Sequence, residues 1–212
     1  MGGTQTELES LKAMHNVIIT TERLRLRPVL PLTDIHSLHR MRQNPTSMKY
    51  SSTGVETEKD PFNSVTFDRI KIMAGAEGFA FAVELKSSNG DAQPEMIGAV
   101  GMFRPGACGY QFDEPYWGMG YATEALTAWL QKYWEYFPEG PESIAPENRN
   151  HLLAHVFEGN VASEKVLLKS GFRVLRAKVP GTQAGHPVIE TVFIVERPEP
   201  VPIPADAAGL PT

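Results

Sequence analysis

The sequence predicts an α/β (α+β) fold, with a single domain in which one sheet of about seven strands is flanked by about four helices. Segments of alternating apolar residues interleave with segments of helical period in irregular order. The 212 residues, 42% of them hydrophobic, are enough for one well-buried core and few for two. The strongest helical pattern directly follows a short strand and a glycine-rich turn.

The first elements are a strand and two helices. Leucines alternate with arginines over residues 23–28, which predicts a half-buried strand that stops at Pro28. Threonine and aspartate offer N-cap chemistry for a helix over residues 33–43. A second helix is predicted over residues 60–76, with Pro61 near its start.

Three strands and the longest helix follow. Residues 79–85 and 96–103 read as strands, joined by a hairpin turn in the Ser-Ser-Asn-Gly-Asp run 87–91. Residues 109–112 predict a shorter strand. Apolar residues then recur at helical spacing and form one face of a long helix. They are Ala122, Ala125, Leu126, Trp129, Leu130, Tyr133, Trp134 and Phe137.

The last elements are three strands and a short helix. Residues 152–157 are nearly all apolar, as expected of a strand buried on both faces. A helix is predicted over residues 161–170, with Gly171 as its natural end. Residues 172–179 and 188–196 complete the set as strands.

The two ends of the chain differ from the domain, which is placed at residues 16–197. Residues 1–15 read as a flexible leader without the apolar core of a signal peptide, and 198–212 as a proline-rich tail. Apolar runs are too short for a membrane span, which favours a cytoplasmic protein with no membrane partner. A net charge of −5 argues against a nucleic-acid partner. The lone Cys108 rules out an internal disulfide and suits a reducing compartment.

The segment 109–125, in which a strand runs into the glycine-rich turn and the long helix, carries the most chemical information. Gly118 and Gly120 open the long helix, so unpaired backbone N–H groups and the helix dipole would face an anion. A diphosphate fits such a turn, although two glycines also make an ordinary tight strand–helix connection. No third glycine completes a dinucleotide fingerprint, and no Gly-Lys-Ser/Thr completes a P-loop, which disfavours a kinase-like nucleotide-binding module.

The run YWGMGYATEAL resembles the acyl-CoA pyrophosphate loop of the GNAT superfamily, and GYATEAL resembles its ribosomal-protein-alanine acetyltransferase (RimJ/RimL-like) branch. A second block, NVASEKVLLKSGF, resembles the same branch's Asn-x-x-Ser helix. TERLRLRPV and EMIGAVGMF fit its first and third strands. The resemblance implies a mixed, mostly antiparallel sheet and an N-acetyltransferase that uses acetyl-CoA and no metal.

The resemblance also implies roles for individual residues. Backbone N–H groups of the loop would hold the pyrophosphate, and a main-chain N–H near Phe112 or Asp113 would polarise the thioester carbonyl. Asn160 would reach the pantetheine amides, and Ser163 would protonate or orient the thiolate. The implied cofactor-binding residues are Phe112, Trp117, Gly118, Met119, Gly120, Tyr121, Ala122, Thr123, Asn160 and Ser163.

Two positions depart from the family pattern. The loop usually begins with Gln or Arg, and here that position is Trp117, which removes a polar phosphate contact but keeps the amides. Leu167 stands where many superfamily members carry a tyrosine that protonates the leaving thiolate. Ser163 also has a structural reading, as a hydroxyl that satisfies backbone donors at the start of a helix.

The general base stays open at this point. The acceptor amine must lose a proton, and the candidates near the resembled site are Glu124, Asp113, His155 and Glu158. Each has a structural alternative, such as dipole stabilisation for Glu124 or a hydrogen-bonded core position for His155. With Ser163, the residues singled out as catalytic are Glu124 and Asp113. His151 and His155 share a strand face but lack a third ligand for a metal.

The acceptor is expected to be a primary amine, either on a small molecule or at a protein N-terminus. Segments 48–60 and 138–150 are predicted to shape its pocket, since loops on a rigid frame commonly carry specificity. The competing hypothesis is a non-catalytic acyl-CoA-binding regulatory module, favoured only by the absent tyrosine at Leu167. Either reading is compatible with a monomer or a homodimer.

Overall fold

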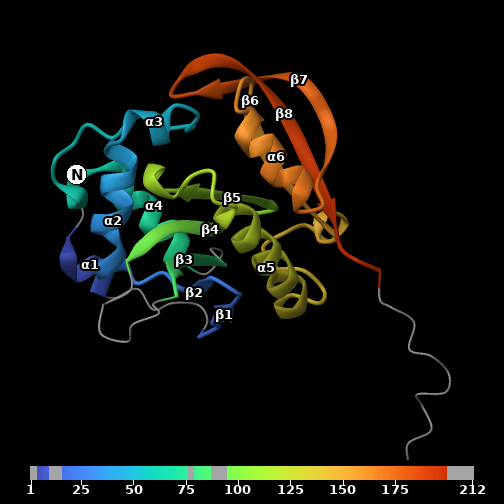
Figure 1. Cartoon of the computed structure of the whole chain (residues 1–212), viewed down its shortest axis with the longest axis horizontal. Helices are drawn as coiled ribbons and strands as arrows, with labels where there is room; N and C mark the ends of the chain where they lie inside the picture. The colour runs from blue at the N-terminus through green and yellow to red at the C-terminus, as the bar shows by residue number, and fades with distance from the viewer. Residues whose placement is uncertain (1–3, 10–15, 76–78, 87–94, 200–212) are drawn as a thin grey trace, which may run out of the picture.

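The computed structural model describes residues 4–9, 16–75, 79–86 and 95–199. Over these residues the chain forms an eight-stranded sheet in the order β1-β2-β3-β4-β5-β6-β8-β7, with helices on both faces (Figure 1). Neighbouring strands are antiparallel except β5 and β6, which are parallel. The predicted α+β class with a mixed, mostly antiparallel sheet is confirmed.

The element bounds show how closely the sequence patterns are realised. The strands are β1 (Ile19–Thr20), β2 (Leu24–Pro28), β3 (Ala80–Leu85), β4 (Met96–Arg104), β5 (Ala107–Phe112), β6 (His151–Phe157), β7 (Arg173–Gln183) and β8 (His186–Glu196). The α-helices are α1 (Gln5–Glu9), α2 (Pro31–Gln43), α3 (Pro45–Met48), α4 (Val65–Ala74), α5 (Tyr121–Tyr136) and α6 (Val161–Lys169). Short 3-10 turns are η1 (Pro61–Asn63), η2 (Glu114–Tyr116) and η3 (Pro146–Asn148).

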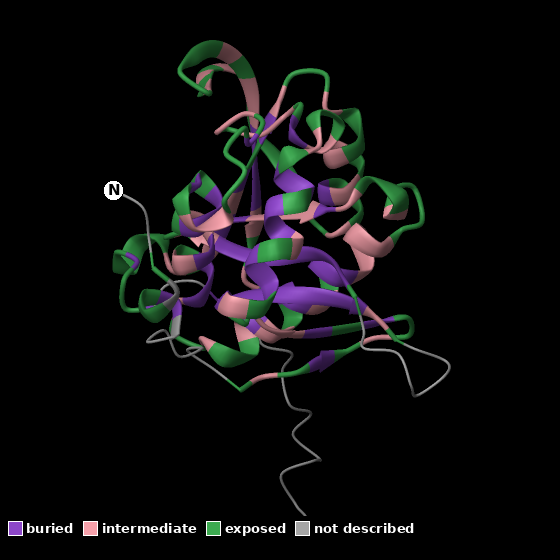
Figure 2. Cartoon of the chain, turned by 90° about the vertical axis from the view of Figure 1, so that its left-hand side faces the viewer, coloured by how far each residue is buried: buried purple, intermediate pink, exposed green. Residues whose placement is uncertain are grey.

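Two hydrophobic clusters cover the two faces of the sheet. On one face, α5 packs its predicted apolar stripe onto strands β2–β6 and β8, with Leu126, Trp129 and Tyr133 fully buried. On the other face, α2 and α4 cover β3 and β4. Figure 2 shows the buried residues gathered in the central strands and in the helix faces against them. This arrangement leaves one end of the central strands β5 and β6 to build a site.

Some elements differ from their prediction. The helix expected over residues 60–76 is broken at Ser64, whose backbone is extended and whose hydroxyl caps α4 through the Thr66 N–H. The expectation that residues 152–157 are buried on both faces is wrong, because only alternate residues of β6 are buried. The hairpin turn predicted at 87–91 lies outside the described residues.

Near the N-terminus, part of the predicted leader forms α1, and Leu8 is 1% exposed within the α2–α4 cluster. At the other end of the domain, β7 and β8 form a long hairpin that arches from α6 toward α3 (Figure 1). The turn of this hairpin places Ala184 and Gly185 at positive φ, which accounts for a glycine at this point.

Candidate active site

The central feature of the site is an opening between β5 and β6. The two parallel strands share a single registered pair, Ala107 with Leu153, and the Leu153 N–H donates to the Gly106 carbonyl at 2.9 Å. Beyond this pair the strands diverge, so their remaining inward-facing peptide groups lack a partner strand. A sheet that splits at its centre presents backbone donors and acceptors to whatever enters the gap.

Backbone alternation identifies the peptide groups of β5 that face the opening. The Asp113 N–H donates to the Ile97 carbonyl at 2.9 Å, so odd-numbered residues here bond toward β4. The N–H groups of Tyr110 and Phe112 therefore point into the gap. Of the two main-chain donors that the sequence left open near the thioester, Asp113 is engaged by β4 and Phe112 remains available.

The loop after β5 is locked by a tryptophan. The Trp117 indole N–H donates to the Phe112 carbonyl at 2.8 Å, which folds the loop back onto the end of the strand. Gly118 and Gly120 follow with φ of 74° and 83°, left-handed values that favour glycine. A side chain at Gly118 would meet no atom within 4 Å, so the surface above this glycine is open. Trp117, which stands where the family usually has Gln or Arg, thus holds the loop in place instead of offering a polar side chain.

The loop presents a row of unpaired donors. No described residue accepts a hydrogen bond from the N–H groups of residues 118–123, and no side chain caps α5. Four such groups at a helix start, together with the dipole, make an anion site. The structure brings the sequence-predicted loop residues together in this one turn. They are Gly118, Met119, Gly120, Tyr121, Ala122 and Thr123.

Arg23 and Glu124 hold the loop in place through an ion pair and hydrogen bonds. The sequence analysis did not single out Arg23 as a site residue. Arg23 reaches the Met119 carbonyl at 2.9 Å, lies over the Tyr121 ring and contacts Glu124 at 2.6 Å. Glu124 also accepts from the Thr21 hydroxyl at 2.5 Å and from the Arg23 N–H at 3.0 Å. Burial alone would raise the pKa of Glu124, but these bonds together lower it, so its carboxylate is a weak proton acceptor.

Glu124→Gln is expected to lower the free energy of unfolding at pH 7 by about 1–3 kcal/mol, because hydrogen bonds to a charged group are lost. A lowered folded-state pKa means that the wild-type advantage is complete above the carboxyl's ordinary pKa. It disappears as pH falls through the folded value. Urea unfolding at several pH values measures the difference. Glu135→Gln, on the exposed side of the same helix, is the matched control and should change little.

The start of α6 lies beside the opening. Asn160 caps α6 by accepting the Ser163 N–H at 3.3 Å, and the Tyr110 hydroxyl donates to the Ser163 carbonyl at 3.3 Å. Burial raises the pKa of Tyr110 to about 12, so the phenol stays protonated near neutral pH. Leu167, where a tyrosine is absent, is 2% exposed in the core. A phenol therefore reaches α6 from β5, although none comes from α6 itself.

Among the remaining base candidates, His155 and Asp113 share the sheet face that bears α2 and α4. The His155 Nδ1 lies 2.8 Å from the Glu190 carboxylate. A carboxylate only accepts, so Nδ1 carries the proton and Nε2 is left with a lone pair. Asp113 caps η2 and lies 3.3 Å from Arg40, and Glu158 is exposed. His155 was expected in the core, and the structure places it outside the core.

The tip of the β7–β8 hairpin contacts the loop after α3 beside the site. Ala184 donates from its backbone to the Ser52 carbonyl at 2.8 Å, and Gln183 reaches the Lys49 carbonyl at 2.6 Å. The Tyr50 hydroxyl bonds the Gly159 carbonyl at 2.9 Å, just before α6. Residues 49–52 thus line the two described cavities, and the role of segment 48–60 in the acceptor pocket stays a prediction. Segment 138–150 lines neither described cavity and packs instead at the end of α5 through Ile144.

Cys108 is buried, and burial raises the pKa of its thiol to about 12, which makes it a core side chain and a poor nucleophile. Within the described ranges, no three His, Cys, Asp or Glu side chains gather as they would around a metal ion. No described helix is both long and apolar enough to cross a bilayer.

Fold and site define a split-sheet α+β protein whose central opening leads to a helix N-terminus ready for an anion. The model of the acetyltransferase (GNAT) domain family matches residues 23–173, and the chain belongs to this family. The match confirms the family that the loop and helix motifs predicted. No curated protein matches the chain significantly.

Three solved structures with the same fold share less than a quarter of their sequence with this chain. A GNAT-family acetyltransferase from Bacillus anthracis is 23% identical with a TM-score of 0.64, covering 85% of this chain and 98% of that one. An acetyltransferase from Agrobacterium tumefaciens is 21% identical with a TM-score of 0.62, covering 85% and 95%. RimL, a ribosomal L7/L12 α-N-protein acetyltransferase in complex with coenzyme A, is 16% identical with a TM-score of 0.59, covering 85% and 98%.

Proposed function

We propose that this chain transfers an acetyl group from acetyl-CoA to a primary amine. The observation that carries the proposal is that the open amides of residues 118–123 follow directly, along the chain, on the unpaired peptide edge of β5. Membership of the GNAT family and the coenzyme A bound to RimL support acetyl-CoA as the donor.

The donor occupies both features. Its pyrophosphate rests on the loop amides, and the pantetheine arm lies in the β5–β6 opening. Asn160, at the start of α6, is available to the pantetheine amides through its side-chain NH₂. The thioester carbonyl then accepts the Phe112 N–H, which stabilises the oxyanion as the amine attacks.

The reaction needs two proton transfers. The amine nitrogen bonds to the carbonyl carbon, the carbon–sulfur bond breaks, and the sulfur leaves as a thiolate that takes a proton. Ser163 remains the proposed donor of that proton, and Tyr110 joins it, because its hydroxyl lies at the Ser163 carbonyl. The amine's own proton passes to His155, held by Glu190. Glu124 and Asp113, which are engaged by arginines, hold the loop rather than move protons.

Ser163→Ala and Tyr110→Phe are each expected to lower kcat about tenfold, and the double variant about 100-fold, because general acid catalysis contributes at this scale. Both changes preserve shape, so acetyl-CoA affinity should stay within about threefold of wild type. Steady-state kinetics with a saturating amine measure the losses. An unchanged kcat in the double variant would assign the thiolate proton to water.

Thermal unfolding with and without acetyl-CoA tests the proposed donor. A ligand at about 100 times its Kd adds roughly 2.7 kcal/mol to the free energy of unfolding. For a chain of this size that raises Tm by about 5–10 °C. A folded sample that shows no shift at millimolar acetyl-CoA contradicts the proposal.

A further inference from the structure

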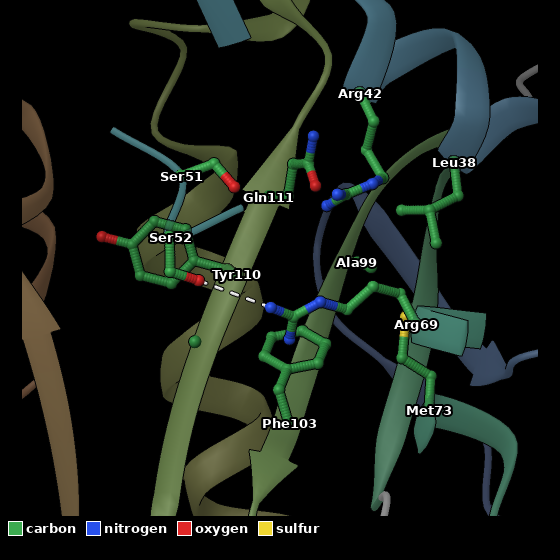
Figure 3. A pocket seen from close by; sticks show the side chains of 11 residues that line it. Leu38, Arg42, Ser51, Ser52, Arg69, Met73, Ala99, Phe103, Tyr110 and Gln111 are labelled. Atoms are coloured by element: carbon green, nitrogen blue, oxygen red, sulfur yellow. Dashed lines mark hydrogen bonds between the residues drawn. The ribbon is translucent and has the colours of Figure 1, made fainter. Parts of the chain in front are cut away.

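A cavity of about 190 Å³ adjoins the proposed site on the α2–α4 face of the sheet (Figure 3). Its floor is formed by β4 and β5, including Gly109, Tyr110 and Gln111. Arg42 from α2 and Arg69 from α4 enter it from one side, opposite the serines at positions 51 and 52. The cavity therefore touches the stretch of β5 whose N–H groups face the opening.

Neither arginine forms an ion pair with another described residue. Arg42 is 4% exposed, donates one bond to the Thr53 hydroxyl at 2.8 Å, and its Nε is buried with no acceptor in the described chain. Arg69 makes one long bond, 3.4 Å to the Ser52 hydroxyl. Within the described residues, no carboxylate lies within 4.0 Å of either guanidinium. Buried charges ordinarily have such partners.

A comparison with Arg27 shows how unusual this is. Arg27 is comparably enclosed but contacts both Asp34 and Glu84, and these partners raise its pKa despite burial. For Arg42, burial and then the charge of Arg69 lower the pKa to about 10, only partly offset by Glu56. Burial and the charge of Arg104 likewise lower the pKa of Arg69. Among the described residues, the positive charge that lines the cavity is thus only partly offset.

We propose that the acceptor is a small amine that also bears an anionic group, a carboxylate or a phosphate, and that Arg42 and Arg69 bind this group. The inference rests on the proposed acetyl transfer and names the substrate class of that site. An oxyanion would bind between the guanidinium groups of Arg42 and Arg69, both of which line the cavity and whose geometry suits such a ligand. The cavity is smaller than typical drug-sized pockets, which favours a metabolite such as an amino acid.

The position of the cavity orients such a substrate. With its anion on the arginines, its amine is directed to β5, where the proposed thioester carbonyl meets the Phe112 N–H. The loop holding Ser51 and Ser52, which the tip of the β7–β8 hairpin contacts, forms one wall of the cavity.

Matched amine pairs test the proposal. The probes are free L-amino acids against the same amino acids as amides, and phosphoethanolamine against ethanolamine, in low-salt buffer without phosphate. We expect kcat/KM to favour the anionic member at least tenfold, since hydrogen bonds to a charged group are at stake. The two pairs distinguish a carboxylate from a phosphate as the bound group. Equal use of the neutral partners would overturn the proposal.

Arginine variants test whether Arg42 and Arg69 cause the preference for anionic amines. Arg69→Gln is expected to raise KM for anionic acceptors about 10- to 100-fold, with kcat and neutral-amine kinetics nearly unchanged. Arg173→Gln, which removes an exposed charge at the start of β7, at the opposite end of the strand from the hairpin tip, is the matched control and should behave as wild type. Arg42→Gln follows the same pattern provided that its circular dichroism matches wild type. An equal loss for both members of each pair would show that Arg69 is merely structural.

Thermal shifts separate this inference from the proposed function. Anionic amines should raise the wild-type Tm without acetyl-CoA, and Arg69→Gln should lose that shift but keep the shift given by acetyl-CoA. If acetyl-CoA gives no shift while the anionic amines still do, the transferase proposal fails and the anion site stands. If acetyl-CoA gives a shift and anionic amines give none, the anion site fails and the transferase proposal stands.

Discussion

Gly118→Glu is expected to weaken acetyl-CoA binding at least about 100-fold, because its carboxylate would lie among the amides proposed to hold the pyrophosphate. The free fold tolerates the new side chain, since a Cβ at Gly118 meets no atom within 4 Å. The positive φ of 74° still costs about 1–2 kcal/mol of stability for any residue other than glycine. Isothermal titration calorimetry measures the affinity.

Gly118→Ala is the control that isolates backbone strain from charge. It should show the same loss of stability while binding acetyl-CoA within about tenfold of wild type. If the glutamate and alanine variants bind equally well, the pyrophosphate does not lie on this loop. The account of the donor site would then be wrong.

His155→Asn is expected to lower kcat by about 10²- to 10⁴-fold, because removing a general base costs this much. The Nε2 lone pair exists only because the Glu190 carboxylate holds the proton on Nδ1. Glu190→Gln should therefore lower kcat by a smaller factor, as expected of a positioning residue. Pre-steady-state and steady-state rates at saturating donor and amine measure both effects.

Affinity for acetyl-CoA distinguishes a base from a structural histidine. His155→Asn should keep its affinity for acetyl-CoA while kcat falls. Asp113→Asn and Glu124→Gln should leave kcat much less changed. If Asp113→Asn gives the large loss of kcat instead, the base assignment moves to Asp113, which the sequence had also singled out.

Local patterns in the sequence were sufficient for much of the fold. The helical spacing of α5 and the glycines at 118 and 120 are short-range signals, because period and positive φ are properties of a few adjacent residues. These signals predicted the loop and the helix that position its amides. The same logic failed for β6, where an apolar run looked doubly buried. Leu153 and His155 lie on the face where α2 and α4 cover β3 and β4, and neither residue of β6 is buried there.

The ionic arrangement of the site could not be predicted in this way. Arg23 and Glu124 are 101 positions apart, and His155 and Glu190 are 35 apart, so only the tertiary fold brings each pair together. The charge of Arg42 and Arg69 is still harder to predict from sequence. The two arginines lie on different helices, and only the tertiary fold determines that neither meets a carboxylate among the described residues. Arginine pairing depends on topology, and a single sequence carries no direct record of it.

Release of coenzyme A in the presence of acetyl-CoA and an amine panel is the most direct test of the proposed acetyl transfer. The panel combines free amino acids, their amides, simple amines and peptides with free N-termini, and mass spectrometry identifies the products. We expect amine-dependent release of coenzyme A together with an acetylated product. The release should be largest with small anionic amines. Tight acetyl-CoA binding with no release above the amine-free background, for any member of the panel, would contradict it and favour a non-catalytic acyl-CoA-binding module.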